Sequence, residues 1–170
     1  FSDEKVLSAR NFANKVWNAS RFALMNLEGP ADDSLPKNIA DKWILTRLND
    51  AIRVVSEHLN DFDLAMAAQK LYDFIWSELC DWYLELAKAP LYGEDEKAAS
   101  ATRATLKYVL TSTLKLLHPF MPFVTEEIYS YLPHTQGSIM VSSWPKETES
   151  FPAEATAMQN IMDIIVAVRN

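Results

Sequence analysis

Apolar residues recur at helical spacing along almost the whole chain, in blocks that are separated by prolines and glycines. Between positions 39 and 59, for example, Trp43, Leu48, Ile52 and Val55 fall on one side of a helix. Corresponding stripes predict further helices over 3–26, 63–89, 96–117, 122–132 and 153–170. Amphipathic helices with short connections bury their apolar sides against one another, and this pattern favours an all-α bundle of about five helices.

The longest predicted helix, 63–89, carries the widest apolar stripe, and we expect it at the centre of the bundle. We expect Pro90 to end it, because proline lacks a backbone donor and its ring clashes with the preceding turn. Residues 138–143 are short and β-like, and they predict an extended strap.

The last predicted helix places Met158, Ile161, Ile165 and Val168 on one side and stops in mid-pattern at Asn170. The sequence also lacks an initiator methionine. We therefore expect a piece of a longer protein, whose last helix docks only loosely, because an unpartnered amphipathic helix is marginal by itself.

Composition argues against several kinds of site. The three glycines are far apart, so neither a glycine-rich phosphate loop nor an ATP site is expected. Three scattered histidines lack the spacing of zinc ligands, and no group of residues suggests a catalytic site. The single cysteine, Cys80, fits a reducing cytoplasm. No run of about 18 apolar residues is present, so no membrane span is expected.

Charge is distributed unevenly along the chain. The formal net charge is -7, which by itself disfavours a nucleic-acid partner. Residues 61–100 carry nine acidic and three basic side chains, whereas residues 1–26 carry four basic and two acidic ones. A basic face near the beginning of the chain therefore remains possible.

The first predicted helix has an unusual outer face. Opposite its apolar side it carries four asparagines, two arginines and one lysine, and no acidic residue between positions 5 and 27. Its members include Asn11, Asn14, Lys15, Asn18, Arg21 and Phe22. Cations bind phosphates, amides read base edges and a ring stacks on a base, so this face suits unpaired RNA. The alternative is that a neighbouring element buries Phe22 and the remaining face is merely solvated.

The third predicted helix carries two further groups of interest. Its aromatic residues Trp76, Trp82 and Tyr83 are expected in the core. Its acidic residues Glu78, Asp81 and Glu85 suggest either metal binding or acid–base chemistry, but their spacing is equally typical of a solvated face, and we favour that interpretation.

Four motifs carry a resemblance to a known family. They are Asn-Lys-x-Trp-Asn-Ala-x-Arg-Phe at 14–22, Cys-Asp-Trp-Tyr at 80–83, His-Pro-Phe-Met-Pro-Phe at 118–123 and Ser-Ile-Met-Val-Ser-Ser-Trp-Pro at 138–145. Together they resemble the anticodon-binding helical domain of class I valyl-tRNA synthetases. The third motif is shared by the branch that charges valine, isoleucine, leucine and methionine, whereas the first two point to valine.

The resemblance implies that residues 1–146 are an anticodon-binding helix bundle. Residues 147–170 would then be a linker and the first helix of a truncated C-terminal region. In that family the whole enzyme uses ATP to join valine to tRNA(Val) in a catalytic domain that this sequence lacks. The segment is therefore expected to be non-catalytic and to need no cofactor or metal. The implied partners are the anticodon loop of tRNA(Val) and the catalytic and C-terminal domains of the parent enzyme, a cytoplasmic monomer with no membrane partner.

The resemblance also implies which residues meet the tRNA. They are Lys15, Asn18, Arg21 and Phe22, with Asn11 and Asn14 on the same face and, by a weaker match, Ala87 and Leu91. The two cations would contact phosphates or base edges, Asn18 would pair with a base edge and Phe22 would stack on a base.

Two alternatives remain open. The same bundle could belong to an isoleucyl- or leucyl-tRNA synthetase, which anticodon-swapped tRNA would distinguish. A helical scaffold could instead bind protein through the acidic third helix, and its binding would depend little on salt, unlike RNA binding.

Overall fold

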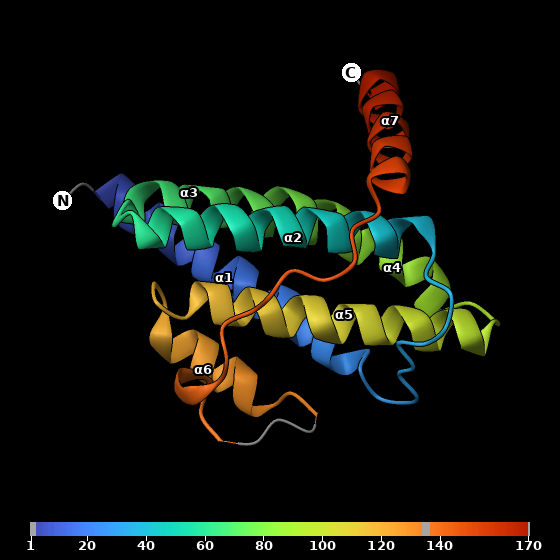
Figure 1. Ribbon diagram of the computed structural model, residues 1–170, viewed down its shortest axis with the longest axis horizontal. Helices are drawn as coiled ribbons and strands as arrows, with labels where there is room; N and C mark the ends of the chain where they lie inside the picture. Colours follow the sequence, from blue (N-terminus) through green and yellow to red (C-terminus); the bar gives the residue numbers. More distant parts are fainter. Residues whose placement is uncertain (1–2, 134–136, 170) are drawn as a thin grey trace.

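The computed structural model describes residues 3–133 and 137–169, so the predicted bounds at positions 1 and 170 lie outside the described part. Figure 1 shows an all-α bundle, which confirms the predicted fold class, and the described residues contain no strand. The elements are α1 (Asp3–Met25), α2 (Ile39–Asn60), α3 (Leu64–Asp73), η1 (Phe74–Tyr83), α4 (Leu84–Leu91), α5 (Glu96–Leu117), α6 (Pro122–Ser130), η2 (Ile139–Val141) and α7 (Pro152–Arg169). Within these ranges, no helix is long and apolar enough to cross a membrane.

Side-chain caps determine where several helices begin. Asn38, Asp63 and Asp95 each precede a helix, and each side chain accepts a hydrogen bond from a backbone N–H of the first turn. These N–H groups have no partner within the helix, so the caps stabilise the helix starts. Pro122 begins α6, a position that suits proline because no backbone donor is needed there.

The predicted third helix is one continuous helix made of α3, η1 and α4, and its middle segment, η1, is π-helical. The prediction that Pro90 ends this helix is wrong. Pro90 lies inside the last turn, and the helix ends after Leu91. A single missing hydrogen bond in the last turn is tolerated, because few residues beyond it have to remain helical.

The third helix lies at the centre of the core, as the sequence predicts, but it shares that place with α2 and α5. Its almost completely buried side chains are Leu71, Phe74, Ile75 and Tyr83. Thirteen of the 22 residues in α5 are buried, including Leu106 and Val109. From α2, Trp43, Leu48 and Val55 are almost completely buried. Many of the buried residues in α5 are Ala, Ser and Thr, which pack closely between helices without standing out as an apolar stripe.

A buried polar cluster joins three helices inside this core. The Tyr83 hydroxyl donates to Asp41 Oδ1 at 2.7 Å, and Thr102 Oγ1 donates to Asp41 Oδ2 at 2.9 Å. Asp41 is 1% exposed and Tyr83 is 0% exposed. Burial raises the pKa of the Asp41 carboxyl, and the two hydroxyl donors partly oppose that rise.

The segment from 142 to 151 runs across α5 and α2 before α7 begins (Figure 1). Asn49 donates to the Thr148 carbonyl at 3.0 Å and accepts from the Thr148 N–H at 2.9 Å. The extended strap that the sequence predicts over 138–143 is wrong at its centre, where Ile139–Val141 forms one 3-10 turn. Ser138 caps that turn by accepting from the Met140 N–H, and this cap favours the turn over extended backbone.

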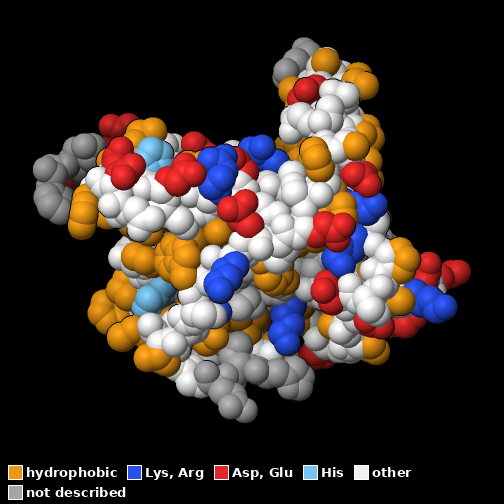
Figure 2. Space-filling view, viewed as in Figure 1, with side chains coloured by type: hydrophobic (Ala, Val, Ile, Leu, Met, Phe, Trp, Pro, Cys, Tyr) orange, Lys and Arg blue, Asp and Glu red, His pale blue; other side chains and the backbone are white. Residues whose placement is uncertain are grey.

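The last helix, α7, packs against α2 only over its first half and then stands away from the bundle (Figure 1). Met158 and Met162 are buried, whereas Ile164 is 65% and Val168 is 82% exposed. Figure 2 shows apolar side chains exposed along this helix. The predicted contact side is therefore correct at Met158 but wrong at Ile161, which is 45% exposed because the buried side runs through Met158 and Met162. It is wrong at Val168 because the helix leaves α2 before the stripe ends.

This arrangement predicts uneven hydrogen exchange. We expect the backbone amides of α7 beyond Met162 to exchange much faster than those of α5, because few buried contacts hold that half of the helix. Exchange followed by mass spectrometry on the same sample gives both rates, with the buried α5 as internal control. Equal protection of α5 and of the outer half of α7 would contradict this expectation.

Candidate nucleic-acid interface

A groove of about 500 Å³ lies between α1 and the third helix. It is lined by Asn11, Asn14, Lys15, Asn18, Ala19 and Phe22 from α1, and by Trp76, Cys80, Leu84, Glu85 and Lys88 from the third helix. The helical spacing of α1 thus brings five of the six predicted outer-face residues to one cavity, where amide, ammonium and aromatic groups stand together.

Lys15 is held inside this groove by two neighbours. Its Nζ lies 2.6 Å from Asp81 Oδ1 and 4.1 Å from the centroid of the Trp76 ring. The ammonium group therefore has both an ion-pair partner and a cation–π partner. Both partners come from η1, more than 60 residues later in the chain, so no pattern within α1 indicates them.

The Phe22 side chain is half-buried. This result lies between the two interpretations of the sequence, an exposed stacking ring and a ring buried by a neighbouring element. Part of the ring packs against the hydrophobic core, and part of it lines the groove. Lys88 Nζ lies over the ring at 5.6 Å from its centroid, and both carboxylate oxygens of Glu85 accept from the same Nζ at 2.7 Å. The ring is thus neither fully exposed nor a core residue.

Aromatic rings from α1 and from the third helix form a cluster beside the groove. The ring centroids of Phe12 and Tyr72 are 4.9 Å apart, and those of Tyr72 and Trp76 are 5.5 Å apart at an interplanar angle of 19°. The prediction that the aromatic residues of the third helix lie in the core is therefore correct for Tyr83 but wrong for Trp76, which lines the groove. Supported by neighbouring rings, Trp76 presents a rigid aromatic surface there.

The π-helical geometry of η1 decides which side chains of the third helix face the groove. The Leu84 N–H donates to the Leu79 carbonyl, five residues back. A π-helix turns by about 80° per residue, against 100° in an α-helix. Asp81 and Glu85 consequently lie on the same side as Trp76, whereas α-helical spacing would place them roughly opposite. Sequence periodicity assumes α-helical spacing, so it misses these two residues.

Three of the predicted binding residues lie outside the groove. Arg21 lines a separate cavity of about 230 Å³ between α1 and α6, together with Trp17 and Tyr131. Ala87 and Leu91 are buried in the core. The third helix instead contributes Leu84 and Lys88 to the groove, one helical turn earlier than the weaker match suggests.

The solvated acidic face that the sequence favours is correct for Asp81 and Glu85, whose side chains are 49% and 64% exposed, but not for Glu78, which is 20% exposed. All three residues also pair with bases. Arg47 donates to both carboxylate oxygens of Glu78, at 2.9 and 2.8 Å, and Asp81 and Glu85 pair with Lys15 and Lys88 as described above. The described residues contain no group of three or more His, Cys, Asp or Glu side chains arranged to hold a metal ion.

Cys80 lies in the lining of the groove, a position that the sequence alone does not indicate. Burial raises the pKa of its thiol to about 11, even though the nearby Lys15 ammonium opposes that rise. The thiol is therefore protonated at neutral pH and adds a small apolar surface to the groove, not a nucleophile.

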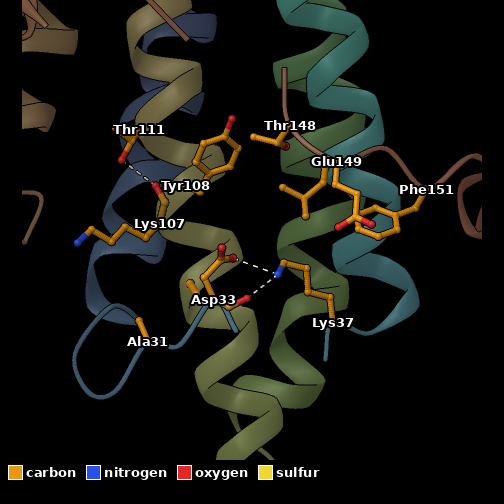
Figure 3. A pocket seen from close by; sticks show the side chains of 11 residues that line it. Ala31, Asp33, Lys37, Lys107, Tyr108, Thr111, Thr148, Glu149 and Phe151 are labelled. Atoms are coloured by element: carbon orange, nitrogen blue, oxygen red, sulfur yellow. Dashed lines mark hydrogen bonds and ion pairs between the residues drawn. The ribbon is translucent and has the colours of Figure 1, made fainter. Parts of the chain in front are cut away.

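A second cavity, of about 520 Å³, lies between α2, α5 and the segment from 142 to 151 (Figure 3). Within it, Lys37 Nζ pairs with Asp33 at 3.0 Å, and Glu149 adds another carboxylate. Figure 2 shows acidic and basic side chains mixed over this side of the molecule. Among the described residues, no asparagine or glutamine lines this cavity, whereas the groove beside α1 offers three asparagines. The groove is therefore better suited to read base edges.

Comparison with known proteins agrees with the family resemblance of the sequence motifs. Residues 41–170 match the family described as the anticodon-binding domain of tRNA ligase. The whole chain is 53% identical to the valine–tRNA ligase of Bacillus subtilis and 52% identical to those of Bacillus licheniformis and Geobacillus stearothermophilus, each over 176 residues. The chain spans 20% of the length of each of these curated relatives.

Proposed function

The chain belongs to the family of anticodon-binding domains of tRNA ligases, and we propose that its groove receives the anticodon loop of a transfer RNA. The observation that carries this proposal is the lining of the groove, where three asparagines, two lysines and two aromatic rings gather from α1 and the third helix. Unpaired loop bases expose both their edges and their faces, and these are the side chains that bind them.

Each kind of lining residue has a role in this proposal. Asn11, Asn14 and Asn18 would donate to and accept from base edges, because an amide offers both functions. Phe22 would stack on a base, and Lys15 would meet a phosphate.

The predicted residues outside the groove would act differently. Arg21 would contact the backbone of the loop from the adjoining face. Ala87 and Leu91 would act only through the helix that supports the lining residues, because both are buried.

We further propose that this segment is part of a valine–tRNA ligase, which would use ATP to join valine to tRNA(Val) in a separate catalytic domain. The identity of 52–53% along the whole chain supports this assignment. Residues 1–146 would form the anticodon-binding unit, and 147–170 would lead into a C-terminal region. The catalytic and C-terminal domains would be its partners in a monomeric enzyme, and the single free Cys80 suits the cytoplasm.

Anticodon hairpins test the proposal directly. We expect a hairpin with a valine anticodon to bind with a Kd in the micromolar range, because few cations face the groove. Hairpins with isoleucine or leucine anticodons should bind at least about fivefold more weakly, the equivalent of one lost hydrogen bond. Fluorescence anisotropy with labelled hairpins of identical stem gives the three values. Tighter binding of an isoleucine or leucine hairpin would assign the domain to that sibling enzyme instead.

Salt dependence separates RNA binding from a protein scaffold. The logarithm of the binding constant should fall steeply with the logarithm of salt concentration if phosphates displace counterions. The scaffold hypothesis places the partner on the acidic side chains of the third helix, but Glu78, Asp81 and Glu85 already pair with bases. If the chain is a protein scaffold instead, binding of its protein partner should depend weakly on salt, and tRNA should not compete with that partner.

A further inference from the structure

Both lysines of the groove lie over aromatic rings, and an acidic residue of the third helix holds each of them there. Lys15 lies over Trp76 and pairs with Asp81, and Lys88 lies over Phe22 and pairs with Glu85. A base that stacked on either ring would need the space that the ammonium group occupies. In the free protein one face of each ring is therefore covered by an ammonium group.

Of these two ion pairs, Lys15–Asp81 says more about ligand binding than Lys88–Glu85. Lys88 and Glu85 are three residues apart on one helix, where such pairs are common. Lys15 and Asp81 are instead on different helices, and Asp81 reaches Lys15 because η1 is π-helical. The side chain of Lys15 is only 25% exposed, so its ammonium group has little water to replace a lost partner.

We propose that Asp81 occupies the place of an RNA phosphate at Lys15 and thereby keeps Lys15 over Trp76. Trp76 is then a second base-stacking surface, which is uncovered when an RNA phosphate takes Lys15 from Asp81. This inference rests on the proposed function of the groove. A ligand phosphate exchanges one ion pair for another, so by itself it gains little. Stacking of a base on the uncovered Trp76 supplies the additional gain.

Two consequences follow for binding. Removing the charge of Asp81 frees Lys15 for phosphate, so affinity for RNA should rise. The salt slope should steepen by up to about one unit, because the Asp81 carboxylate that loses Lys15 takes up a counterion, whereas asparagine does not. Removing the Trp76 ring should weaken binding, although neither the sequence pattern nor the family resemblance predicts a contact between Trp76 and RNA.

The test is a double-mutant cycle with the valine-anticodon hairpin. We expect Asp81→Asn to tighten binding by about two- to fivefold, the range for a partly exposed ion pair. In a Lys15→Ala background the same change should have almost no effect. Asp73→Asn is the matched control, because it removes the same charge from the same helix at a side chain that accepts from Gln69. Trp76→Leu should weaken binding at least about fivefold, whereas Trp144→Leu, on the segment from 142 to 151, should not.

The outcomes separate this inference from the function on which it rests. If the hairpin binds but Asp81→Asn acts like Asp73→Asn, or acts equally with and without Lys15, Asp81 does not hold the lysine back. If Trp76→Leu binds like the parent chain, the second stacking surface is wrong. If the hairpin binds only to Asp81→Asn, the role of Asp81 stands, because its ion pair with Lys15 then blocks binding to the isolated domain. Failure of both proteins to bind would overturn the inference and the proposed function together.

Discussion

Replacing Asp41 with alanine should lower the free energy of unfolding by about 2–4 kcal/mol, because it leaves buried hydroxyl donors without an acceptor. Tyr83 is completely buried and donates to Asp41 Oδ1, and Thr102 donates to Oδ2. These bonds join α2, η1 and α5, so their loss also weakens the packing of these three elements. Urea denaturation followed by circular dichroism measures the change.

Asp41→Asn is the control for this prediction. The asparagine oxygen still accepts from Tyr83, and its NH2 group can donate to the Thr102 hydroxyl oxygen, so the loss should be clearly smaller than for alanine. Equal losses in the two variants would mean that the volume of the side chain matters and its hydrogen bonds do not. A loss below about 0.5 kcal/mol in Asp41→Ala would show that the cluster contributes little.

The raised pKa of Asp41 also predicts how the stabilities of the unsubstituted chain and of Asp41→Asn depend on pH. A carboxyl whose pKa is higher in the folded than in the unfolded protein contributes stability that is complete below the unfolded value, ordinarily 3.8. That contribution is lost as the pH rises through the folded-state pKa. Asparagine does not titrate, so the stability of the parent chain relative to Asp41→Asn should fall as the pH rises from about 4 towards neutral.

The helices could be predicted from the sequence because their signals are local. The stripe of Trp43, Leu48, Ile52 and Val55 gives the buried side of α2, and all four are buried. That α5 shares the centre with the third helix could not be predicted, because burial in α5 depends on small residues and on neighbours far away in the sequence. The same holds for α7, since no local pattern shows where its contact with α2 ends.

Only half of the candidate site could be predicted. Helical spacing on α1 was sufficient to group Asn11, Asn14, Lys15, Asn18 and Phe22, and they line one groove. The opposite wall depends on the π-helical turn of η1, which rotates its side chains relative to α-helical expectation. Ionic partners such as Asp81 are long-range contacts, and an α-helical projection of the third helix turns them away from Trp76.

Phe22→Ala should weaken binding of the valine-anticodon hairpin by about 1–3 kcal/mol, or roughly five- to 150-fold, if the ring stacks on a base. Phe22 lines the groove but also packs against the core. We therefore also expect a loss of stability that is smaller than the 3–5 kcal/mol typical of a fully buried phenylalanine. Thermal melts and anisotropy on the same variants give both numbers. Phe123→Ala is the matched control, because it removes an aromatic ring that is 90% exposed on α6 and should change neither.

Phe22→Leu separates the two roles of this ring. Leucine restores most of the apolar contact with the core, so stability should return close to that of the parent chain. It offers no aromatic face to a base, so binding should remain weak, whereas Phe22→Tyr should bind nearly as well as the parent chain. The variants are compared well below their melting temperatures, so that unfolding contributes nothing to the binding difference. If Phe22→Leu regains both stability and hairpin affinity, the ring contributes volume alone, and the stacking role assigned to Phe22 is wrong.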